Sequence, residues 1–107
     1  MRVTVTHNKG LQGVMKIVDD SADQLMASAT TGPVVVTDVN RRWEGSTLHF
    51  SFTGRMGLLS APIKGYVQCN ESDVVIEVEL PGLLKHFLSE DKVRAQVESK
   101  VRGLLSA

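Results

Sequence analysis

The chain contains three histidines, and none has a neighbour with which it could do chemistry. His7, His49 and His86 are predicted on separate elements, without a carboxylate or second histidine at the spacing of a metal-binding pair. A histidine at a strand end or on an outward sheet face is usually a solvated polar residue. His49 is the one to follow, because its sheet face forms the floor of a cleft if the covering helix leaves space there.

The carboxylates and the single cysteine also have ordinary structural explanations. Asp19 and Asp23 lie one helical turn apart, where they could hold a hard cation. The run lacks the tight, glycine-containing turn of a calcium loop, so we interpret it as the solvated face of a helix. Cys69 is in phase with Ile63 and Val67 on a predicted strand, which favours a buried structural thiol over a nucleophile.

Motifs for covalent or phosphate chemistry are missing from the sequence. No serine sits in a G-x-S-x-G elbow, and no glycine pattern resembles a phosphate-binding loop. The sequence therefore predicts no catalytic residue, no cofactor and no metal site. We expect a protein that works by binding and is not an enzyme.

The most informative stretch is residues 54–59, which lies between two predicted strands and carries three large apolar side chains. Met56, Leu58 and Leu59 stand where a connection normally runs over the surface. One interpretation is a hydrophobic contact for a lipid, polymer or protein surface. In the other, Leu58 and Leu59 start the next strand and pack into the core. The sequence leaves both open.

Composition limits the class of protein. The 107 residues, 42% of them apolar, predict a single domain over residues 1–107. The 12 basic and 12 acidic residues balance, which argues against nucleic-acid binding. The longest apolar runs are far below the ~20 residues of a membrane span, and the alternating residues 1–6 do not resemble a signal peptide. One cysteine fits a reducing compartment. We expect a cytoplasmic protein.

Apolar periodicity predicts the order β-α-β-β-β-β-α. Apolar residues alternate in 1–6, recur at spacings of three and four from 11 to 29, and alternate again in 34–43, 48–53, 63–69 and 74–80. Gly32 and Pro33 mark the end of the first helix, and a bulge is expected near 38–41. Ser89 is a candidate N-cap for a second helix that ends near 105. The expected fold is α+β: an antiparallel sheet covered on one face by two helices.

Taken together, the chain resembles the small bacterial polyhydroxyalkanoic acid system proteins, which are linked to storage-polyester granules. The resemblance covers almost the whole length and lies mostly in core and turn residues. It is carried by His7, the following amphipathic helix, Trp43-Glu44-Gly45, Leu48, Phe50, Gly54, Ile63-Lys64-Gly65, Val67, Val78-Glu79-Leu80-Pro81, Leu83-Leu84, Phe87 and Leu104-Leu105. The chain departs from the family pattern in the helix after residue 11, which lacks the usual Arg and Ala, and in residues 56–61, which are longer and more apolar. The resemblance implies a granule-associated or regulatory role without enzymatic activity, and it supplies no active-site residues.

Two other functions remain open. The predicted order is similar to a reduced helix-grip arrangement of START-like lipid-binding domains, which implies a carrier of a small apolar ligand. That function requires a cavity of at least ~300 Å³ between the sheet and the C-terminal helix. Its lining would include Phe50, Phe52, Val67, Ile76 and Val101. Alternatively, the protein is an interaction module that forms a homodimer through an edge strand, for which the N-terminal strand is the natural candidate.

Overall fold

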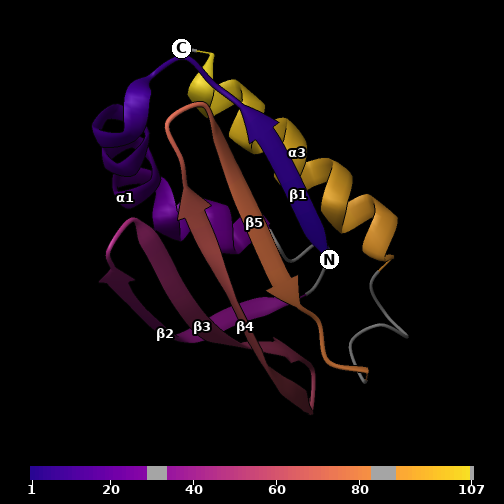
Figure 1. Cartoon of the computed structure of the whole chain (residues 1–107). Helices are drawn as coiled ribbons and strands as arrows, with labels where there is room; N and C mark the ends of the chain where they lie inside the picture. Colours follow the sequence, from indigo (N-terminus) through magenta and orange to yellow (C-terminus); the bar gives the residue numbers. More distant parts are fainter. Residues whose placement is uncertain (29–33, 83–88, 107) are drawn as a thin grey trace.

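The computed structural model describes residues 1–28, 34–82 and 89–106, and the fold is given for these ranges. Its elements are β1 (Arg2–Thr6), α1 (Gly10–Ser28), β2 (Val35–Glu44), β3 (Thr47–Met56), β4 (Leu59–Cys69), β5 (Asp73–Glu79) and α3 (Glu90–Leu105) (Figure 1). Within the described ranges this is the order that periodicity predicts. The predicted stop signal at Gly32-Pro33 and the apolar residues 83–88, which include His86, lie outside the described residues.

The strands form one antiparallel sheet in the order β1-β5-β4-β3-β2. Strands β2 to β5 follow one another as a meander of hairpins. Strand β1 comes first in the chain but pairs with the last strand, from Arg2 opposite Glu77 to Thr6 opposite Asp73. The sheet therefore joins residues from both ends of the chain, and β1 and β2 form its two edges.

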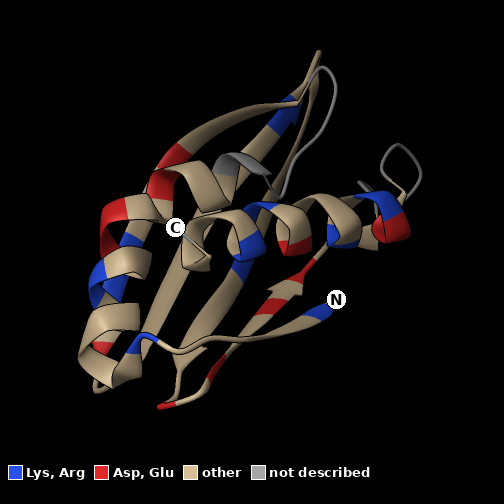
Figure 2. Cartoon of the chain, turned by 90° about the horizontal axis from the view of Figure 1, so that it is seen from above, with Lys and Arg blue, Asp and Glu red and all other residues tan. Residues whose placement is uncertain are grey.

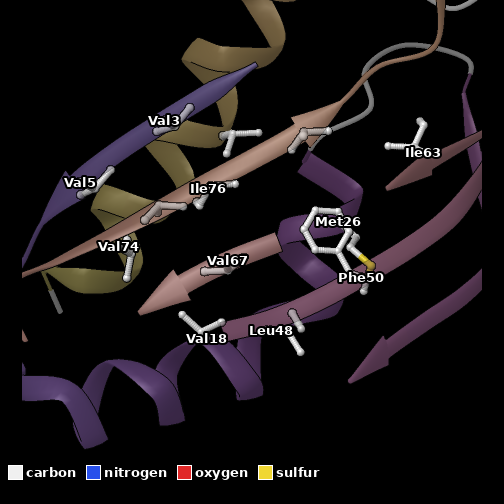
Figure 3. Close-up of a cluster of buried hydrophobic side chains, with 14 of the residues drawn as sticks. Val3, Val5, Val18, Met26, Leu48, Phe50, Ile63, Val67, Val74 and Ile76 are labelled. Atoms are coloured by element: carbon white, nitrogen blue, oxygen red, sulfur yellow. The ribbon is translucent and has the colours of Figure 1, made fainter. Parts of the chain in front are cut away.

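Both helices lie on the same face of this sheet (Figures 1 and 2), as predicted. Along β1, β3 and β5 every second side chain points to that face and is buried, which is the alternation seen in the sequence. Helix α3 begins directly after Ser89, whose hydroxyl accepts a hydrogen bond from the backbone N–H of Lys92 (3.4 Å). The buried apolar residues that the helices contribute are Val14, Val18, Ala22 and Met26 from α1 and Val93, Val97, Val101 and Leu105 from α3. Figure 3 shows Val18 and Met26 among the side chains of the sheet.

Strand β2 contains the bulge that the ambiguous pattern of residues 34–43 predicts. Its register against β3 shifts between Thr37 and Asn40, and Asp38 lies in the left-handed region with φ 55°. The side chains of Thr37 and Asn40 hydrogen-bond to the carboxylate and the carbonyl of Asp38, both at 3.3 Å. These contacts satisfy polar groups that an ordinary strand would offer to a neighbour.

The β3–β4 hairpin is longer than the sequence predicts. Strand β4 starts at Leu59 and includes Pro62, a residue that usually ends a strand because it has no N–H. The ladder between β4 and β5 stops at Lys64 opposite Glu79, so Pro62 lies where β4 pairs only with β3. The hairpin consequently extends beyond β5.

Gly65 allows three strands to approach closely in the middle of the sheet. A β-carbon built on this residue would collide with the carbonyl oxygen of Glu77 and lie 2.9 Å from the ring of Phe50. Phe50 is the cross-strand partner of Gly65, and its ring occupies the helix-side space that a side chain would need. Only glycine fits this position without moving a strand or the ring.

Candidate functional site

The three predicted contact residues meet at the end of the β3–β4 hairpin. Met56 ends β3 and pairs with Leu59 at the start of β4, while Gly57 and Leu58 form the turn between them. Gly57 has a positive φ of 62°, and Leu58 does not, which is the pattern of a type II′ turn with glycine first. The turn type thus fixes Leu58 at the outermost position of the hairpin.

The exposure of the three side chains decides between the two interpretations of residues 54–59, a surface contact or packing into the core. The side chain of Leu58 is fully exposed (104%), Leu59 is 36% exposed, and Met56 is half-buried. Leu59 does start a strand, but neither leucine is part of the buried core. We call Met56, Leu58 and Leu59 the hairpin tip.

An exposed apolar residue of the neighbouring strand lies near the tip, but its side chain is on the opposite face of the sheet from those of Met56 and Leu59. Val35 is 58% exposed and pairs with Arg55, one residue before the tip. Sequence reasoning missed Val35, because its proximity to the tip follows from the pairing of β2 with β3. Arg55 is the only charged residue in the sequence from 53 to 63, so the end of the hairpin combines apolar side chains with a single positive charge.

The predicted cavity residues are brought together but leave almost no space. Phe50, Phe52, Val67, Ile76 and Val101 are all buried between the sheet and the helices. Two voids occur among the described residues here, of about 20 and 10 Å³. A void of that size holds a single water at most. At these positions, the described part of the chain therefore lacks the cavity of at least ~300 Å³ that a ligand carrier requires.

The opposite face of the sheet carries a row of polar side chains that crosses all five strands. The cross-strand partners in this row are Arg2, Glu77, Tyr66, His49 and Arg42, which we call the polar row. No described element covers it, and all of its members except Arg2 line a shallow, open hollow of about 570 Å³. His49 therefore lies on the floor of a hollow, but on the uncovered face and not beneath a helix.

Contacts within the polar row are mostly long and exposed. Arg2 Nε donates to Glu77 Oε2 at 2.7 Å, and Arg2 Nη2 lies 3.4 Å from the Tyr66 hydroxyl. The hydrogen bond between Arg2 and Glu77 lowers the pKa of the Glu77 carboxyl and raises the pKa of the Arg2 guanidinium. Arg42 and His49 lie 3.7 and 3.6 Å from the carboxylate of Glu44. Such exposed pairs contribute little stability and reorganise readily.

The other residues considered for chemistry have structural partners. The backbone N–H of Lys9 donates to His7 Nδ1 (3.1 Å), so Nε2 is the nitrogen that donates to the carbonyl of Asn70 (2.9 Å). Cys69 is buried, as predicted. Within residues 1–28, 34–82 and 89–106, no three metal-ligating side chains gather.

Asp19 is not simply solvated, as the sequence analysis proposed, but connects α1 to β2. Its carboxylate accepts a hydrogen bond from Trp43 Nε1 (2.9 Å), and its backbone carbonyl accepts one from Arg41 Nη1 (2.9 Å). Trp43 is only partly buried and packs against the core. The periodicity of one helix does not reveal a partner 24 residues away.

We expect Asp19→Ala to lower the free energy of unfolding by about 1 kcal/mol, because the indole N–H loses its acceptor. Trp43 is the only tryptophan, so its fluorescence reports the site directly, and its emission shifts to longer wavelength. Asp20→Ala is the matched control, since Asp20 forms an ion pair with the exposed Lys16 at 3.0 Å on the surface of the same helix. Equal unfolding midpoints in urea for the two variants would contradict the role of Asp19.

Comparison with known proteins identifies the family. The family model described as "putative polyhydroxyalkanoic acid system protein" matches residues 1–105. Searches of curated proteins and of solved structures found no match. None of the described helices is long and apolar enough to span a membrane. With a match over nearly its whole length, the chain belongs to the family of polyhydroxyalkanoic acid system proteins.

Proposed function

We propose that this protein is a non-enzymatic binding protein that associates with polyhydroxyalkanoate granules in the cytoplasm or regulates them, and that the hairpin tip makes the contact. The observation that carries the proposal is the fully exposed side chain of Leu58 at the end of a projecting hairpin. An isolated exposed leucine is common, but here it adjoins Leu59, which pairs with Met56 across the hairpin. Family membership supports the polyester as the surface concerned.

The chemistry of the tip suits a weakly polar polymer surface. Aliphatic polyester presents methylene and ester groups without charge, so burial of apolar side chains is the available source of affinity. Burying Met56, Leu58 and Leu59 contributes on the order of 5 kcal/mol before ordering costs. That amount supports reversible association and is too small for permanent anchoring.

The test is sedimentation of the purified protein with polyhydroxyalkanoate granules. We expect the variant in which Met56, Leu58 and Leu59 are all replaced by serine to lose at least about 90% of the granule-bound fraction, because most of the buried apolar area is gone. Since the tip lies outside the core, the far-ultraviolet circular dichroism and melting temperature of the variant remain near those of the wild type.

Val39→Ser is the matched control. Val39 is 44% exposed at the bulge of β2, so the substitution also removes an exposed apolar side chain but leaves the tip intact. Binding of this control at the wild-type level, with loss in the triple variant, supports the proposal. Equal binding by the wild type and the triple variant excludes the tip as the contact surface, and absence of binding by the wild type excludes the granule role.

A further inference from the structure

We infer that His7 is a pH-sensitive contact at the start of α1, in which the neutral imidazole holds the chain that leads into the helix and the protonated ring releases it. His7 lies between the end of β1 at Thr6 and the start of α1 at Gly10. Its side chain is partly buried, and each of its two ring nitrogens meets a backbone group. The junction between the sheet and the helix therefore depends on how this ring is protonated.

The two ring nitrogens have opposite roles. The backbone N–H of Lys9 donates to Nδ1 at 3.1 Å, so Nδ1 must be free of a proton. Nε2 lies 2.9 Å from the backbone carbonyl oxygen of Asn70, which can only accept, so Nε2 must carry the proton. These contacts select the neutral ring and one of its two tautomers. The charged ring cannot keep both partners.

Protonation removes one of these contacts and keeps the other. A proton on Nδ1 points at the N–H of Lys9, and two donors cannot share a hydrogen bond. The hydrogen bond from Nε2 to Asn70 remains and is strengthened by the charge of the ring. The backbone N–H of His7 also donates to the carbonyl of Ser72 at 2.9 Å, whatever the charge of the ring. In acid, the turn between β4 and β5 therefore stays attached to β1, while the entry to α1 is released.

Positive groups lie on the helix side of His7. Nδ1 meets the chain just before the N-terminus of α1, where the helix dipole disfavours a cation. Arg102 of α3 lines the same open cleft of about 800 Å³ as His7 and Lys9. Residues 5–9 form one part of the lining of this cleft and the end of α3 forms the other. Release of the Lys9 N–H therefore changes the shape of the cleft with pH.

Carboxylates lie on the turn between β4 and β5 and at its end. Asp73 accepts a hydrogen bond from the side chain of Asn70 at 2.7 Å. Glu71 Oε1 lies 3.6 Å from a β-carbon built on Gly10, at the start of α1. Because this turn is the one that His7 already contacts, its carboxylates stabilise the protonated ring once the ring has given up its contact with the helix entry.

Hydrogen exchange measured by NMR on the full chain tests this contact one amide at a time. From about pH 8 to about pH 5, where histidines usually titrate, we expect the protection factor of the Lys9 amide to fall at least about fivefold, the factor that one ordinary hydrogen bond contributes. The His7 amide, which donates to Ser72, is the internal control and keeps its protection. At the higher pH, two-bond proton–nitrogen spectra should show the ring proton on Nε2.

His7→Asn and His49→Asn separate this contact from other effects of acid. The asparagine oxygen at position 7 can accept from the Lys9 N–H in a similar turn, but it does not titrate. We expect Lys9 protection to be independent of pH in His7→Asn and to fall as in the wild type in His49→Asn, which changes a histidine of the polar row.

Three results would overturn the role of His7: a neutral ring that carries its proton on Nδ1, wild-type Lys9 protection that does not change with pH, or the same fall in His7→Asn. The first two need no variant, so they decide the question even if His7→Asn does not fold. The tip triple variant keeps the wild-type response to pH, so failure of this contact and failure of the granule contact are separate results.

Discussion

Replacing Gly65 by alanine is expected to lower the free energy of unfolding by about 3 kcal/mol. The added β-carbon meets the backbone carbonyl of Glu77, which cannot rotate away as a side chain can. Relief requires separating β4 from β5 or expelling the ring of Phe50 from the core. Urea unfolding followed by Trp43 fluorescence measures the change.

Gly103→Ala is the control for this prediction, since it makes the same chemical change in open space. Apart from the backbone of α3 itself and the two neighbouring residues, no heavy atom of the described residues lies within 4 Å of a β-carbon built on Gly103. Alanine favours a helix over glycine by up to about 1 kcal/mol, so this variant is expected to be more stable than the wild type. If Gly65→Ala matched the wild type in stability, the close approach of the strands at Gly65 would be disproved.

The second large effect concerns pH and Cys69. Its side chain is 1% exposed, and burial raises the pKa of the thiol from 9.0 to about 11. The folded protein therefore keeps this proton to a higher pH than the unfolded chain does, and unfolding releases it between pH 9 and 11. The associated stability is complete below pH 9 and is lost as the pH rises towards 11, by about 2 to 3 kcal/mol in all.

Comparing how steeply the free energy of unfolding changes with pH in the wild type and in Cys69→Ala isolates the contribution of the thiol. The wild type and Cys69→Ala differ only in this thiol, so the difference between their slopes belongs to Cys69. We expect the free energy of unfolding to fall more steeply with pH in the wild type. At pH 8, iodoacetamide should modify the native thiol at least about 100-fold more slowly than the urea-unfolded thiol, because thiolate is scarce and access is closed. Modification of native Cys69 at the rate of a free thiol would refute its burial.

The local features of the fold were predictable from sequence because each depends on a few neighbouring residues. Alternation gave the strands, Ser89 marked the start of α3, and the irregular phase before Trp43 indicated the bulge at Asp38. The extension of β4 through Pro62 was missed. A strand can contain proline at this position only because β5 stops pairing with β4 before reaching it. The pattern of residues within one strand does not show where the neighbouring strand of the sheet ends.

The candidate site was only partly predictable for the same reason. Three apolar side chains in a predicted connection identified the hairpin tip, but the turn geometry at Gly57 decides that Leu58 is outermost. The polar row can be recognised only when the register of all five strands is known. The missing cavity depends on how closely the helices approach the sheet, as with Met26 of α1 and Phe50 of β3, which line the same small void (Figure 3). That distance is set by packing of all the side chains together.

The pairing of β1 with β5 also has a consequence for biosynthesis. Strand β1 is separated from its partner β5 by about 70 residues, which take roughly 4 to 14 seconds to translate at ordinary rates. During that interval the meander from β2 onwards can form through short-range contacts, whereas Val3 and Val5 wait without a neighbouring strand. We therefore expect docking of β1 to be a late event that depends on closing a long loop.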